Sequence, residues 1–168
     1  LLALPLYAQA GGPQVINVTV QEYGLFESDI GEAMSPEGPG NQQQVLEMTN
    51  ERLVEQTNHI PLRTGIILGV HYIVNTDPAG VQLPVTLKLI YPDGSHIWGE
   101  TTIDTDKQWF NSYTINDPGG HPEGTYHYVI EYNGQVLVEL PFEFYHPGNT
   151  APSPEAYTPK PKHAPNTK

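Results

Sequence analysis

Apolar and polar residues alternate in several short runs of this chain, and this two-residue period constrains the fold more than any other feature. The clearest run places Ile66, Leu68, Val70, Tyr72 and Val74 at every second position. Segments rich in Pro, Gly, Asp and Asn separate the runs at intervals of about 10 to 14 residues. A two-residue period puts alternate side chains on one face of a β-strand, and no stretch shows a convincing helical period. We therefore expect an all-β chain.

The runs predict strands at residues 14–26, 65–75, 83–91, 95–104 and 108–116, followed by a hairpin at 121–148. In the first strand, Ile16, Val18 and Val20 are expected to share a face, and Gly24 indicates a bulge or bend. Residues 42–57 fit neither period, so a helix capped by Asn41 and an extended segment ending in a strand at 53–57 both stay open; we favour the extended segment. This pattern predicts an immunoglobulin-like antiparallel β-sandwich of about seven or eight strands.

The hairpin at residues 121–148 has the clearest structural signals in the sequence. Asn133-Gly134 joins two alternating runs, and this pair is the strongest signal for a two-residue turn because both positions tolerate a positive φ. Gly124 permits a tight start to the first of the two strands. We expect Tyr126 to pack across the sandwich, which makes the hairpin a closing element of the sheet.

The two ends differ from the rest of the chain in composition. Residues 1–10 are apolar and finish with Ala8-Gln9-Ala10, which is typical of the later half of a secretory signal peptide. Residues 149–168 contain five prolines and few apolar side chains, so we expect a disordered tail. Residues 28–44 are expected to form a long loop. The β-sandwich domain is therefore expected at residues 11–148, in a periplasmic or secreted protein.

Charge and cysteine content exclude several classes of function. The chain has a net charge of −12 and no cysteine, so it has neither disulfides nor thiolate ligands. Nucleic acids and anionic lipids both need basic patches, and the sequence contains no run long enough to insert into a membrane. We therefore expect no nucleic-acid partner and no membrane insertion.

Several short elements together resemble one family. They are Glu22-Tyr23-Gly24-Leu25, Thr57-Asn58-His59-Ile60-Pro61 followed by Gly65 and Gly69, Tyr91-Pro92, and Gly124-Thr125-Tyr126 with Tyr132, Gly134 and Phe142. On these residues the chain resembles the small exported bacterial proteins of domain of unknown function 3859, over about residues 15–145. The chain departs from that family at Tyr126, where tryptophan is common. The resemblance supplies no catalytic or binding residue, and we interpret the following as scaffold: Tyr23, Gly24, Pro61, Gly65, Gly124, Tyr126 and Gly134.

Metal binding is the first hypothesis for a specific site. The seven histidines form no H-x-H or H-x-x-x-H pair, but His71 and His127 both lie in the middle of expected strands and would converge if those strands paired. Asp104-Thr105-Asp106 resembles half of a calcium loop but lacks the spaced ligands and the glycine of an EF-hand. We interpret it as an acidic turn.

Sugar binding and catalysis are the second and third hypotheses. Trp98 is expected to point outward beside Glu100, as in a stacking platform for a sugar, whereas Trp109 is expected in the core. No serine lies in a G-x-S-x-G elbow and no spaced His and Asp set indicates a triad. We therefore expect a non-enzymatic binding or accessory module without a cofactor, whose partner is another protein. A carbohydrate- or metal-binding domain is the main rival interpretation, and a hydrolase is the weaker one.

The small-residue triplet generates a first testable prediction. If Ala8-Gln9-Ala10 is a cleavage site, the exported protein begins at Gly11. Intact-mass measurement on exported protein would check this, and a mass that still includes residues 1–10 would contradict it.

Overall fold

The computed structural model describes residues 12–29 and 49–148. Within these ranges the chain forms nine strands and one short 3-10 helix. They are β1 (Gln14–Glu27), β2 (Arg52–Glu55), β3 (His59–Pro61), β4 (Ile66–Asp77), β5 (Gln82–Ile90), β6 (His96–Asp104), β7 (Gln108–Ile115), η2 (Pro118–Gly120), β8 (Gly124–Tyr132) and β9 (Gln135–Tyr145). The expected signal-peptide remnant, the expected tail and most of the expected loop at 28–44 lie outside the described residues.

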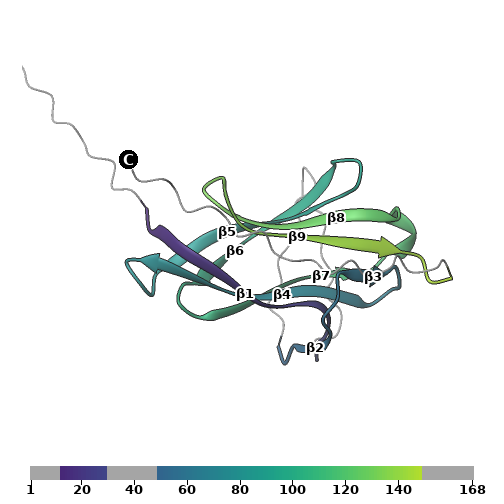
Figure 1. Cartoon of the computed structure of the whole chain (residues 1–168), viewed down its shortest axis with the longest axis horizontal. Helices are drawn as coiled ribbons and strands as arrows, with labels where there is room; N and C mark the ends of the chain where they lie inside the picture. Colours follow the sequence, from purple (N-terminus) through teal and green to yellow (C-terminus); the bar gives the residue numbers. More distant parts are fainter. Residues whose placement is uncertain (1–11, 30–48, 149–168) are drawn as a thin grey trace, which may run out of the picture.

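The strands form two sheets that stack as the layers of a sandwich (Figure 1). One sheet has the order β2-β1-β4-β7 and the other β3-β9-β8-β5-β6. The immunoglobulin-like sandwich predicted from the sequence is confirmed. Two details differ: β3 was not predicted, and it pairs in parallel with β9, whereas the other pairs are antiparallel. In the segment that fitted neither period, the described part contains β2 and no helix.

The core lies between the inner faces of the two sheets. Its largest fully buried aromatic side chains are Tyr72, Tyr126, Phe142 and Phe144. The alternating face predicted for β4 is confirmed, and β5 and β8 alternate in the same way, because apolar residues at every second position of these strands pack in the core. Without cysteines, this packing has to hold the sheets together.

The first strand corrects one prediction. Ile16, Val18 and Val20 do not form one buried face, because Ile16 lies in the bulge where the pairing with β4 shifts between Val15 and Asn17. Ile16 is 64% exposed, whereas Val18 packs against the core. Val20 follows Val18 in regular register and is 36% exposed, on a part of β1 that has no strand beside it among the described residues.

A further bulge changes the inner face of β9. The β8–β9 register shifts between Ile130 and Glu131, and this brings Leu137 into the core beside Val138. Simple alternation predicts Val136 on that face instead. Val136 is only partly buried.

Tyr126 joins the start of β8 to the chain that leads into it. Its ring is fully buried and stacks on Phe144 with a centroid distance of 4.0 Å, and its hydroxyl donates to the carbonyl of Pro122 at 2.9 Å. A tyrosine that bonds to backbone just upstream of its own strand is typical of immunoglobulin-like corners. At the other end of the hairpin, Asn133 and Gly134 have φ angles of 47° and 75°, as a two-residue turn requires.

The remaining scaffold residues lie at the strand ends and in the β1–β2 contact. Gly24 has a φ of 135°, and a Cβ there would lie 2.2 Å from the carbonyl oxygen of Glu55, so only glycine lets β2 approach β1 this closely. Tyr23 packs edge-on against Phe142. Pro61 ends β3, Gly65 precedes β4 and Gly124 begins β8. Across the described part of the chain, no helix has the length and apolar character to cross a bilayer.

The corner tyrosine generates a stability prediction. Tyr126→Ala removes a buried ring and should lower the free energy of unfolding by about 3 to 5 kcal/mol. Tyr126→Phe keeps the ring and loses only the hydrogen bond to Pro122, so it should cost about 1 kcal/mol. Urea denaturation of both variants measures the difference. If Tyr126→Ala unfolds at the same urea concentration as the parent protein, the ring does not stabilise the core.

Candidate functional sites

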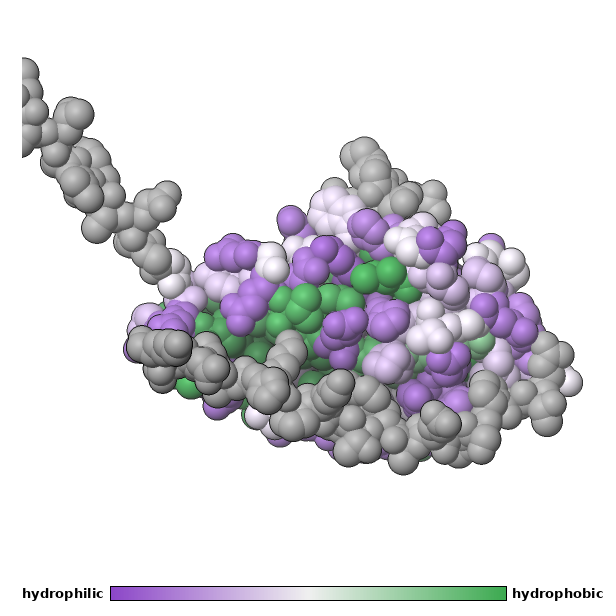
Figure 2. Space-filling view, turned by 45° about the horizontal axis from the view of Figure 1, so that its top comes forward, coloured by the Kyte–Doolittle hydropathy of each residue, from purple (hydrophilic) through white to green (hydrophobic). Residues whose placement is uncertain are grey.

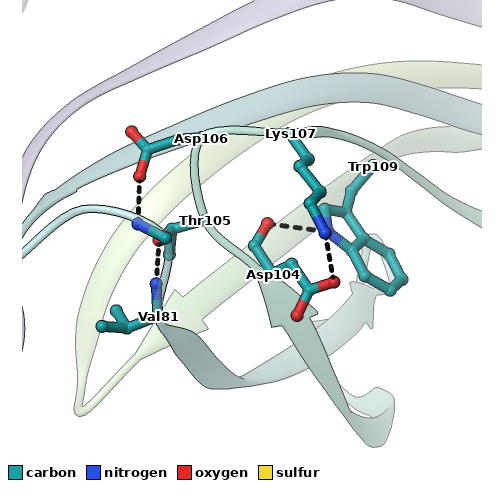
Figure 3. A network of polar contacts seen from close by, with 7 residues as sticks. Val81, Asp104, Thr105, Asp106, Lys107 and Trp109 are labelled. Carbon is teal, nitrogen blue, oxygen red and sulfur yellow. Dashed lines mark hydrogen bonds and ion pairs between the residues drawn. The ribbon is translucent and has the colours of Figure 1, made fainter.

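The acidic turn between β6 and β7 is held against the neighbouring β4–β5 turn (Figure 3). The buried hydroxyl of Thr105 accepts from the amide of Val81 at 3.0 Å, and the carboxylate of Asp106 accepts from the amide of Gly80 at 2.7 Å. The backbone amide of Asp106 donates to the carbonyl of Val74 at 2.8 Å. These bonds join turns that are more than twenty residues apart in the sequence.

Asp104 stabilises the same turn through two contacts. Its carboxylate lies 3.1 Å from the ammonium of Lys107, and its carbonyl accepts from the indole N–H of Trp109 at 2.8 Å. Trp109 packs against the core, as predicted. Since Asp104 and Asp106 both have donors within the protein, the geometry favours the acidic turn over a calcium loop.

His71 lies on the outer face of its sheet within a small aromatic cluster. Its ring centroid is 5.2 Å from that of Phe26 and 4.8 Å from that of Phe110. Its Nδ1 is 2.9 Å from a carboxylate oxygen of Glu22, and its Nε2 is 3.6 Å from one of Glu51. The two ring nitrogens therefore face carboxylates of its own chain, and the arrangement fastens the segment before β2 to β1 and β4.

His127 does not meet His71. It lies on β8, in the other sheet, where its Nδ1 is 3.1 Å from a carboxylate oxygen of Glu139 on β9. The metal site predicted from these two histidines required their strands to pair, and β4 pairs with β1 and β7 instead. Among residues 12–29 and 49–148, no group of three potential metal ligands comes together.

Trp98 and Glu100 lie on the face of β6 that points away from the core. Trp98 is partly buried and lies opposite Lys88, whose ammonium is 2.5 Å from a carboxylate oxygen of Glu131. Glu100 is exposed opposite Thr86. The outward position expected for Trp98 therefore agrees with its register, and a sugar-stacking role stays a prediction.

His121 occupies an aromatic box at one end of the sandwich that the sequence did not suggest. Its ring stacks on Tyr91 at 5.5 Å, and the rings of Tyr113, Tyr126 and Phe144 surround it at 5.8 to 6.1 Å. The hydroxyl of Tyr113 lies 3.2 Å from Nε2, whereas the buried Nδ1 has no hydrogen-bond partner among the described residues. These residues come from distant parts of the chain, so only the fold brings them together.

Burial controls the ionisation of this box. Burial lowers the pKa of His121, partly offset by the nearby carboxylate of Asp117, and burial raises the pKa of the hydroxyls of Tyr91, Tyr113 and Tyr126. The box is therefore a neutral, packed cluster. Its residues stabilise the loop that follows β5 and the loop between β7 and β8.

The outer edge of β1 is open over most of its length in the described structure. β2 pairs only with Leu25, Phe26 and Glu27, so the edge from Gln14 to Gly24 has no strand beside it among the described residues. The stretch from Gln14 to Gln21 contains no charged residue. It also carries Ile16 and Val20, two of the three large apolar side chains that are exposed in the described residues. Apolar residues are visible on the side of the molecule where β1 and β9 lie (Figure 2).

Comparison with known proteins finds partial structural similarities and no family. No family model and no curated protein matches the chain. An immunoglobulin-like protein from Pseudomonas aeruginosa is similar in structure, with a TM-score of 0.45 and 17% identity over 77% of this chain and 97% of that chain. The alkylpurine DNA glycosylase AlkC of Pseudomonas fluorescens has a TM-score of 0.37 and 20% identity over 52% of this chain and 27% of its own. A β-glucosidase from Listeria innocua has a TM-score of 0.38 and 8% identity, again over 52% of this chain but only 15% of its own.

His121 generates a pH prediction. Its pKa in the folded protein is below the ordinary 6.5, so the unfolded chain takes up a proton at higher pH than the folded protein does. The free energy of unfolding should therefore fall as the pH drops through about 6.5. His121→Phe keeps a stacked ring without the titrating group and should show a smaller loss.

Thermal melts of both proteins at several pH values between about 8 and 5 provide the measurement, because the two proteins differ in no other titratable group. Equal losses in the two proteins would show that His121 does not contribute.

Proposed function

We propose that this chain is an exported, non-enzymatic β-sandwich module that binds another protein along the free edge of β1. The observation that carries the proposal is the uncharged, partly apolar edge from Gln14 to Gln21. A sheet edge presents unpaired backbone N–H and C=O groups, and an extended segment of a partner can pair with them as an added strand.

Proteins usually protect such edges with charge or proline, and two of the three other long edges of this sandwich carry such residues. β9, which β3 covers only from Glu143 onward, bears Glu139 and Pro141 along its open part. The β6 edge carries the exposed Glu100. The third edge, β7, has neither charge nor proline, but it exposes no large apolar side chain. The edge from Gln14 to Gln21 combines the absence of charge and proline with two exposed apolar side chains, and this combination supports a binding role there.

The rest of the molecule supports the same assignment. The acidic turn, the His71 cluster and the His121 box have their polar groups directed at the chain's own residues, and each joins elements of the fold. The residues at 1–10 support export. A net charge of −12 is unfavourable for contact with nucleic acid or anionic lipid and leaves proteins as the natural class of partner.

Carbohydrate binding is a second candidate function, favoured by a specific observation. Trp98 and Glu100 lie on one outward face of β6, where an aromatic ring beside a carboxylate can stack and hydrogen-bond a sugar. Loss of glycan binding in Trp98→Ala with unchanged stability would favour this second function.

Photo-crosslinking in cells tests the proposed site. A photoreactive amino acid is placed at position 16 or 20 on the β1 edge, and at exposed position 102 on the β6 edge as the control. We expect a defined protein adduct from the two β1 positions and none from position 102. The captured protein is then purified, and its dissociation constant is measured by calorimetry.

Edge variants test the mechanism with that purified partner. Ile16→Lys places a charge on the edge and should weaken binding at least about tenfold, because a buried lysine opposes strand addition. Val54→Lys is the matched control, since Val54 is 60% exposed but lies on β2. Equal binding by Ile16→Lys and the parent protein, or crosslinks from position 102 alone, would overturn the proposal.

A further inference from the structure

Resting on the proposed function, we infer the chemistry of the captured segment. It is an antiparallel strand of alternating apolar residues that carries lysine or arginine just before the strand begins. Three features of the β1 edge carry this inference: the spacing of its bulges, its two exposed apolar side chains, and the unequal charge at its two ends.

The bulges set the length of the docking strand. Regular pairing with β4 runs from Asn17 to Val20, between the shifts at Val15/Asn17 and Val20/Glu22. A bulge bends its strand and interrupts the ladder, so an added strand pairs best between two bulges. A partner strand of about five residues, or about 17 Å, matches this stretch and its margins.

The exposed apolar side chains of β1 determine which side chains the partner strand presents. Val20, the last residue of the regular stretch, is 36% exposed, and Ile16, in the bulge just before that stretch, is 64% exposed. A partner that places an apolar side chain beside Ile16 and another beside Val20 removes apolar surface from water at both points. Side chains alternate along a strand, so the partner alternates as well.

The charge at the edge is unequal. Past the C-terminal end of the uncharged stretch lie Glu22, Glu27, Glu51 and Glu55, and the one basic residue among these neighbours is Arg52, which pairs with Glu27 at 3.1 Å. His71 faces Glu22 and Glu51, but Glu55 is exposed. The stretch from Gln14 to Gln21 is uncharged. A partner therefore gains by placing positive charge at the Glu22 end and nowhere else along the edge.

The direction of the partner strand, taken together with this charge asymmetry, decides on which side of the captured segment the basic residues lie. Antiparallel pairs outnumber parallel pairs roughly two- to three-fold, and in an antiparallel partner the residues before the strand lie beside the C-terminal end of β1. Basic residues are thus expected on the N-terminal side of the captured segment.

Three synthetic peptides test the inference on the full chain. All share a five-residue core of alternating valine and threonine; the first has two lysines before the core, the second two lysines after it, and the third two glutamates before it. Fluorescence anisotropy at low salt gives their affinities, and amide NMR shifts locate binding. The lysine-first peptide should bind about tenfold more tightly than the lysine-last peptide, the glutamate-first peptide should bind least, and about 0.5 M salt should reduce these differences.

Two charge variants give the matched comparison. Glu55→Lys should remove most of the preference for the lysine-first peptide, whereas Glu100→Lys, at an exposed position on β6, should leave it intact. Tighter binding of the lysine-last peptide would show a parallel strand and overturn the inference. Equal affinity of all three peptides, with shifts at Asn17 to Val20, would overturn it while leaving the proposed function in place.

Two further outcomes separate the inference from the proposed function. Peptide-induced shifts confined to residues away from β1 would overturn both. Self-association of the free protein that Ile16→Lys abolishes, measured by sedimentation, would identify a second copy as the occupant and overturn the inference.

Discussion

Apolar packing between two sheets is the interaction on which the rest of this structure depends. The chain has no cysteine, so no disulfide joins the layers. Tyr72 from one sheet and Tyr126, Phe142 and Phe144 from the other are fully buried between them. The turns, the corner at Pro122 and the outward-facing clusters keep their positions because this packing fixes the strands that carry them. Burial of these large aromatic rings also explains how the chain remains compact although few positive charges offset its negative ones.

The sequence predicted those elements whose alternation is uninterrupted. β4, β5 and β8 have regular inner faces, and the Asn133-Gly134 turn specifies its own hairpin. The face predicted for β1 was wrong at Ile16, which lies in a bulge, and bulges depend on the partner strand rather than on the local pattern. β3 was missed because three residues are too few to show a period.

The candidate sites were less predictable, since each depends on which strands become neighbours. His71 and His127 looked equivalent in the sequence, yet the topology places them in different sheets. The box around His121 draws residues from three strand ends and two loops, and no spacing in the sequence indicates it. Whether the edge of β1 is open depends only on the order of the strands in the sheet. The absence of charge from Gln14 to Gln21 was a visible signal, but its meaning requires knowing that β1 lies at an edge.

The parallel pairing of β3 with β9 has a consequence for how the molecule is assembled. β3 precedes most of the sandwich in the sequence, but its hydrogen-bonding partner is the last strand of the domain. A chain that emerges from a ribosome or a translocation channel N-terminus first therefore leaves Ile60, which is fully buried in the finished molecule, without its neighbour Phe144 until the end. Completion of the domain therefore waits for its C-terminal strand, and the chain stays incompletely folded until β9 is available.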